Sequence, residues 1–190
     1  MKIHLVNKPI HLNTEYLIDS ISFFAEKLLS KNSINKIKLT IKFKSNFIKN
    51  HGLEAECIWE DDNYRPKEFT IHLDSKLSER KIIQALAHEM THVKQYTKNE
   101  VFDFIKTSNI IKWKGKKFDI DKIDYWECPW EIEAYGYEKC LYQLLNVGAP
   151  DVRQRLRPPA GELDPLLPRE AVRSWEREED RARDMSQARR

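Results

Sequence analysis

The stretch Ser78–Thr97 has the sequence SERKIIQALAHEMTHVKQYT, which includes the pentapeptide His88-Glu89-Met90-Thr91-His92. Ser78 followed by an acidic residue is typical of a helix start, because the hydroxyl can accept a hydrogen bond from the first turn. Apolar residues then recur at helical spacing, which predicts a helix with one buried side. Its apolar residues are Ile82, Ile83, Leu86, Ala87, Met90 and Val93. An H-E-x-x-H pattern is therefore expected in the middle of an amphipathic helix.

The two histidines of this pattern are predicted metal ligands. His88 and His92 are four residues apart, so on a helix they lie one turn apart on the same face. Zinc suits two imidazoles, because it accepts nitrogen and oxygen ligands in tetrahedral geometry. Glu89 is rotated from His88 by about 100° and can act as a general base toward water. This arrangement is typical of zinc peptidases, and chance spacing of two histidines is the alternative.

A third protein ligand is expected in the segment CPWEIEAYGYE, residues 128–138. Pro129 is tolerated in a first turn and predicts a helix from there to Asn146. Glu131 and Glu133 flank the apolar side of this helix, where a carboxylate is costly unless it is paired or coordinated. The two point about 200° apart, so one of them is expected to bind the ion. Gln95 lies near the face of His88 and could hydrogen-bond a ligand or contact this helix.

The two half-motifs together resemble a known group of enzymes. His88-Glu89-x-x-His92 followed by Glu131-x-x-Ala134 resembles the gluzincin branch of zinc metallopeptidases, including the ImmA/IrrE-like peptidases. The run HEMTHVKQY … WKGKKF … YWECPWEIEAY is also similar to minimal metallopeptidases of phages and bacteria, loosely grouped as SprT-like. The resemblance covers residues 36–145. It implies a zincin-like fold and a bound Zn²⁺, with Glu131 as third ligand and Glu89 as base.

The sequence departs from this family pattern at two points. SprT proteins usually supply a third histidine, and no histidine follows His92 here. Many gluzincins place Asp or Asn after the alanine, where it orients a ligand histidine, but Tyr135 occupies that position. Glu133 and Glu138 are the candidate substitutes for this orienting group.

The remaining patterns predict an α+β fold. A helix is expected from Asn13 or Thr14 to Ser30, and a hairpin over 110–120 turning at Lys114-Gly115. Strands are expected over 36–44, 54–60 and 68–74. By analogy with zincins, a sheet edge strand at 68–74 is expected to hold an extended substrate by main-chain pairing.

Composition divides the chain near position 146. All lysines lie before position 140, whereas ten of the twelve arginines and five of the eight prolines lie after 146. We therefore expect a metallopeptidase domain over 1–146 and an Arg/Pro-rich tail over 147–190. The tail is expected to be either disordered or of a different origin.

Charge and hydropathy limit the function classes. A net charge of +3 on 190 residues gives no electrostatic argument for nucleic acid binding. No apolar run is long enough for a membrane span, no secretory signal is visible, and three cysteines form no paired framework. A cytoplasmic zinc metallopeptidase acting on a peptide or protein is thus expected; if it is phage-encoded, it would act in the host cytoplasm or virion. The alternative is a catalytically silent zinc-binding interaction module, such as a phage accessory or virion protein.

Overall fold

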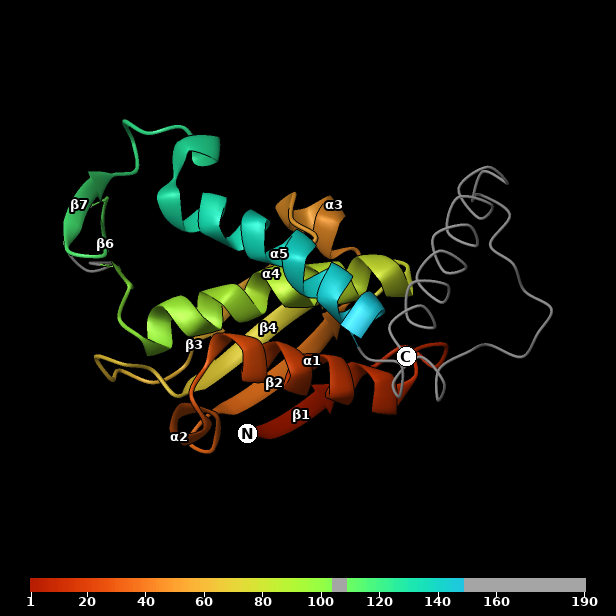
Figure 1. The fold of residues 1–190 in the computed structure, drawn as a ribbon. Coiled ribbons are helices and arrows are strands. Elements are labelled where there is room, and N and C mark those ends of the chain that lie inside the picture. Colours follow the sequence, from red (N-terminus) through yellow and green to blue (C-terminus); the bar gives the residue numbers. More distant parts are fainter. Residues whose placement is uncertain (104–108, 149–190) are drawn as a thin grey trace, which may run out of the picture. The chain divides into compact units, whose positions relative to one another are not determined.

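The main sheet has four strands in the order β1-β2-β4-β3 (Figure 1). A computed structural model describes residues 1–103 and 109–148, and these form an α+β domain, as expected. The four strands are β1 (Lys2–Val6), β2 (Lys38–Lys44), β3 (Ala55–Trp59) and β4 (Glu68–Asp74). β1, β2 and β4 run parallel, and β3 pairs with β4 in the antiparallel direction. The predicted strands of the sheet are therefore confirmed, and β1 was not predicted.

β4 lies inside the sheet, so the prediction that residues 68–74 form an edge strand is wrong. β2 pairs with one side of β4 and β3 with the other. Its residues from Phe69 to Asp74 are all buried, including the polar Thr70 and His72. The chain turns back between β3 and β4, which places β3 outside β4. β3 is therefore the edge strand at this side of the described sheet.

Two long helices cover one face of this sheet. They are α1 (Thr14–Leu28) and α4 (Glu79–Thr97), and α5 (Pro129–Gly148) packs on α4 (Figure 1). The side chain of Asn13 accepts a hydrogen bond from the Tyr16 N–H, and Ser78 does the same for the Lys81 N–H. Both helix starts agree with the sequence prediction. The core between sheet and helices is aliphatic and aromatic, with Phe24, Ile41, Ile71, Leu86 and Leu141 among its buried residues.

A second, smaller sheet follows α4. It consists of β5 (Val101–Asp103), β6 (Ile110–Trp113) and β7 (Lys116–Asp119). β6 and β7 form the predicted hairpin, in which Lys114 and Gly115 both have positive φ angles of 44° and 91°. Such a pair fits a two-residue turn that matches strand twist. β6 also pairs with β5, which follows α4 in the chain.

Short elements that the sequence did not predict complete the fold. They are α2 (Lys31–Ile34), α3 (Phe47–His51) and a 3₁₀ turn at Tyr125–Glu127 that directly precedes α5. The predicted tail, 147–190, lies outside the described residues apart from Val147 and Gly148, which end α5. Among the described helices, none combines the length and hydropathy needed to cross a membrane.

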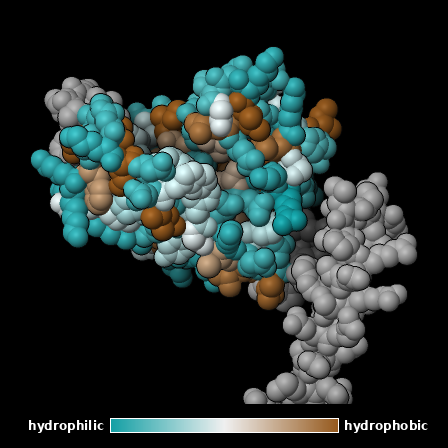
Figure 2. All heavy atoms as spheres, turned by 90° about the horizontal axis from the view of Figure 1, so that it is seen from above, coloured by the Kyte–Doolittle hydropathy of each residue, from teal (hydrophilic) through white to brown (hydrophobic). Residues whose placement is uncertain are grey.

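The face of the molecule above α5 is mainly hydrophilic, and its hydrophobic residues form small groups (Figure 2). Individual exposed apolar side chains include Trp126 and Ile132. Scattered residues of this kind are ordinary on a protein surface. This face therefore presents no single broad apolar area among the residues shown.

Candidate metal centre

Three side chains from two helices converge at one point. His88 and His92 lie one turn apart on α4, and Glu131 is in the first turn of α5. The Nε2 atoms of His88 and His92 lie 3.3 and 3.6 Å from the two carboxylate oxygens of Glu131. One ligand atom from each residue lies within 4.8 Å of the others. The three residues, two of them buried, could therefore hold a metal ion.

The carboxylates of Glu131 and Glu138 favour the protonated form of His88. Burial disfavours a charge on the His88 ring, but hydrogen bonds to Glu131 and Glu138 outweigh burial and raise the pKa of His88 to about 9. Burial likewise opposes ionisation of Glu131. The neighbouring His88, His92 and Tyr125 outweigh it and lower the pKa of Glu131 below its usual value. Metal binding at His88 would therefore have to displace a proton.

The side-chain amide of Gln95 orients His92. His92 Nδ1 lies 2.9 Å from Gln95 Oε1, and burial lowers the pKa of His92. Gln95 is fully buried, and its Nε2 donates to the Trp130 carbonyl at 2.9 Å and to Glu133 at 3.1 Å. Gln95 thus contacts both a candidate ligand and α5, the two roles that its position suggested.

Glu133 is not part of the ligand group, the name used for His88, His92 and Glu131 together. Its carboxylate pairs with Lys94 at 2.8 Å and with Lys114 at 2.9 Å, besides accepting from Gln95. Burial acts to raise its pKa, but these donors outweigh burial and lower the pKa of Glu133. Two glutamates flank the apolar side of α5. Glu131 contacts the two histidines, and Glu133 forms ion pairs with the two lysines.

Glu138 and Tyr135 contact the far side of His88. A carboxylate oxygen of Glu138 lies 3.4 Å from His88 Nδ1. The Tyr135 ring packs edge-to-face on the His88 ring, with centroids 4.6 Å apart. Glu138 therefore occupies the position from which a carboxylate can fix the imidazole tautomer.

Tyr125 contacts the candidate ligand Glu131, and the ligand pattern did not predict this contact. Its hydroxyl donates to Glu131 at 2.7 Å, from the 3₁₀ turn before α5. Burial and this hydrogen bond raise the pKa of Tyr125 above its usual range. No spacing rule links Tyr125 to Glu131, because the contact depends on the path of the chain between the two.

Glu89 is buried beside the ligand group. Burial raises the pKa of Glu89 to about 8, which the nearby His88 only partly offsets. A carboxyl with such a pKa can both accept and release a proton near neutrality. Glu89 also lines two pockets next to these residues, so it is accessible to a molecule bound there.

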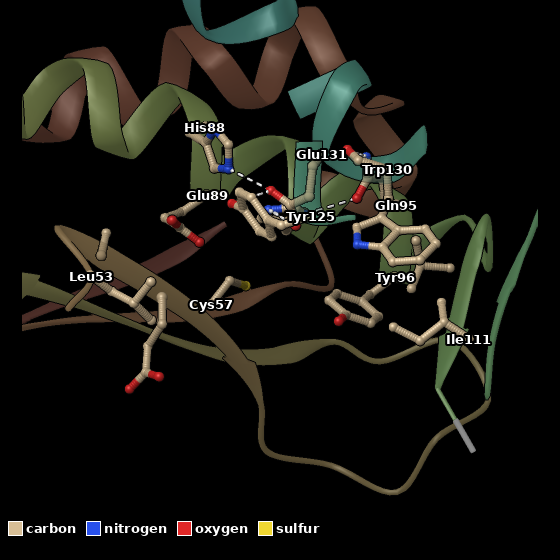
Figure 3. A pocket seen from close by; sticks show the side chains of 14 residues that line it. Leu53, Cys57, His88, Glu89, Gln95, Tyr96, Ile111, Tyr125, Trp130 and Glu131 are labelled. Atoms are coloured by element: carbon tan, nitrogen blue, oxygen red, sulfur yellow. Dashed lines mark hydrogen bonds and ion pairs between the residues drawn. The ribbon is translucent and has the colours of Figure 1, made fainter. Parts of the chain in front are cut away.

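Two adjoining pockets form the cleft over the centre, and Figure 3 shows the side chains that line the smaller one. Their volumes are about 220 and 440 Å³. Both pockets are lined by Leu53, Ala55, His88, Glu89 and Tyr125. His88 therefore lies where the two pockets meet, and His92 and Glu131 line the smaller pocket, as do Ala55, Glu56 and Cys57 of the edge strand β3.

Comparison of this chain with family models, with curated proteins and with solved structures gave no match.

Proposed function

We propose that this chain is a zinc-dependent metallopeptidase with a zincin-like arrangement of helix, sheet and cleft. The observation that carries the proposal is the position of Glu89. It lines the same cleft as His88, His92 and Glu131, next to an edge strand. A general base and a set of metal ligands that face one cleft are the minimum that metal-assisted hydrolysis requires.

The donor set fits zinc. Two imidazoles and one carboxylate are a ligand set of catalytic zinc sites, in which a fourth position is left for water or substrate. His88, His92 and Glu131 would hold the ion. When bound, zinc would polarise a peptide carbonyl and lower the pKa of water.

Glu89 would move the proton during hydrolysis. Its carboxylate would accept a proton from the water that attacks the carbonyl carbon. It would then pass this proton to the amide nitrogen as the C–N bond breaks. Burial favours the protonated form of Glu89, and a cation bound beside it would favour the carboxylate that accepts the proton.

β3 would hold the substrate backbone. One side of β3 pairs with β4, and its residues Ala55, Glu56 and Cys57 line the cleft. The unpaired main-chain groups of an edge strand can bind an extended peptide as an additional strand. β3 therefore takes the role that the sequence assigned to residues 68–74.

A Glu89→Gln variant tests the proposal. The full-length parent is compared with the Glu89→Gln and His88→Ala variants. Each protein is loaded with zinc and dialysed, and its metal content is measured by elemental analysis. Each is then incubated with a peptide library, and cleavage is detected by mass spectrometry. We expect Glu89→Gln to retain zinc and lose cleavage, and His88→Ala to lose both. Glu79→Gln, an exposed change at the start of α4, is the matched control and should cleave like the parent.

Two results would contradict the proposal. Cleavage by Glu89→Gln at the parental rate would exclude Glu89 as base. Stoichiometric zinc in the parent without cleavage of any library peptide would favour the silent zinc-binding module.

A further inference from the structure

The two pockets of the cleft differ in chemistry. The pocket of about 220 Å³ extends from the ligand group to Tyr96, Val101, Ile111 and Trp130. In Figure 3, Trp130, Tyr96 and Ile111 lie together on one side of Glu131. The other pocket contains the charged residues Glu54, Lys81 and Glu138. One end of the cleft is thus largely apolar, and the other is polar.

The apolar end is built on a hydrophobic cluster of its own. Val101 and Trp130 are buried together with Cys128, and Tyr96 and Ile111 pack against them. These residues come from α4, β5, β6 and α5, so four elements hold the wall in place. A wall supported in this way is largely preformed, which reduces the entropy cost of binding.

The described residues that line this pocket include no lysine or arginine that could pair with an acidic side chain of a substrate. Besides His88, Glu89, His92 and Glu131, the charged residue that lines this pocket is Glu56. Glu56 already pairs with His72 at 2.6 Å. Burying an acidic side chain beside these carboxylates would be costly, whereas an apolar side chain would gain from leaving water.

We propose that this apolar end of the cleft binds an apolar side chain of the substrate, on a residue flanking the scissile peptide bond. Tyr96, Val101, Ile111 and Trp130 are then specificity-determining residues. The inference rests on the proposed function, because the ligand group and Glu89 fix where the scissile bond lies.

The test measures binding by isothermal titration calorimetry, so it needs no turnover. Zinc-loaded full-length protein is titrated with the hydroxamates of N-acetyl-leucine, N-acetyl-glycine and N-acetyl-glutamate, which share one zinc-binding group. A second series compares 2-isobutylsuccinyl hydroxamate with unsubstituted succinyl hydroxamate. Its isobutyl group extends from the zinc-binding hydroxamate toward the other side of the scissile bond. In at least one series we expect the isobutyl compound to bind about tenfold more tightly, or better, than its unsubstituted partner.

Variants at Ile111 identify the pocket. Ile111 is half-buried on β6, away from the candidate ligands. A change at Ile111 should therefore not affect how the hydroxamate of each probe binds zinc. Ile111→Lys should abolish the preference for the isobutyl compound, and the milder Ile111→Ala should reduce it. Ile120→Lys adds the same charge at an exposed isoleucine outside the pocket and should leave the preference unchanged.

The outcomes separate the two proposals. Equal binding of isobutyl and unsubstituted probes in both series would overturn the inference and leave the proposed function standing. A preference that survives unchanged in both Ile111 variants would also overturn it. If no hydroxamate bound to the zinc-loaded protein, the open metal position would be absent, and the proposed function would fail together with the inference.

Discussion

His92 and Gln95 form a hydrogen-bonded pair whose orientation is fixed by α5. Gln95 Nε2 uses its protons on the Trp130 carbonyl and on Glu133, so Oε1 is the amide atom that faces His92 at 2.9 Å. An amide oxygen only accepts, so His92 Nδ1 is the donor. His92 Nε2 then carries the free lone pair, 3.6 Å from a Glu131 oxygen. This pair selects the tautomer that metal ligation requires.

Replacing Gln95 should therefore weaken zinc binding without removing a ligand. We expect Gln95→Leu to lower zinc affinity by about 10–100-fold, because His92 loses the acceptor that fixes its tautomer. Competition with a chromophoric chelator measures the change. Gln143→Leu, an exposed change on α5, is the control and should bind zinc like the parent. Unchanged affinity in Gln95→Leu would show that the pair does not support the ligand.

The two glutamates of α5 should differ when each becomes glutamine. Glu131 lies beside both imidazoles, whereas Glu133 is linked to His92 by hydrogen bonds through Gln95. We expect Glu131→Gln to lower zinc affinity by more than the roughly 10–100-fold typical of groups that only orient a ligand. Glu133→Gln should stay within that range. Elemental analysis after dialysis distinguishes them, and equal zinc loss would contradict the assignment of Glu131.

Local patterns predicted the elements that carry the site, but not every contact within it. The alternation of β2 and the apolar stripe of α4 depend on neighbouring residues, so the sequence reveals them. Glu131 and Glu133 both flank the apolar side of α5, and only the packing of α5 against α4 separates their roles. Spacing alone therefore left two ligand candidates.

The position of a strand within a sheet was harder to predict. Residues Glu68–Asp74 alternate between apolar and polar side chains, which is typical of a strand with one exposed face. Thr70 and His72 are nevertheless buried, and the Phe47 ring of α3 lies 5.9 Å from the His72 ring. The burial of the second face of β4 depends on α3. Whether β4 lies at the edge or in the centre of the sheet depends on its pairing with strands that are distant in the sequence. Neither is encoded within the seven residues of β4.

Asp74 should make the stability of the fold depend on pH in the acidic range. Burial opposes its ionisation, but backbone N–H groups of Phe47, Ile48 and Lys76 donate to the carboxylate and lower the pKa of Asp74 below the usual 3.8. A carboxyl whose pKa is lower when folded adds stability above the unfolded pKa. That contribution disappears as the pH falls through the folded pKa.

We expect Asp74→Asn to lower the free energy of unfolding at pH 7 by about 1–3 kcal/mol. The difference from the parent should narrow as the pH falls below about 4, the usual pKa of an unfolded Asp, and then through the lower pKa of folded Asp74. Urea unfolding at pH 7, 5 and 3 measures both effects. Asp62→Asn, in an exposed turn, should change stability at pH 7 by less than about 0.5 kcal/mol. A constant difference across these pH values would contradict the assigned role of Asp74.

Lys94 should be important for stability because it is charged and only 5% exposed. Its ammonium pairs with Glu100 at 2.6 Å and with Glu133 at 2.8 Å, and so joins the end of α4 to α5. Lys94→Met keeps much of the side-chain volume but leaves both carboxylates without this partner. Removing one member of a buried ion pair costs about 3–5 kcal/mol, and the partly exposed glutamates should reduce this to about 2 kcal/mol. In a double-mutant cycle by urea unfolding, Lys94→Met should cost less in a Glu133→Gln background. Equal costs in both backgrounds would show that Lys94 and Glu133 are not coupled.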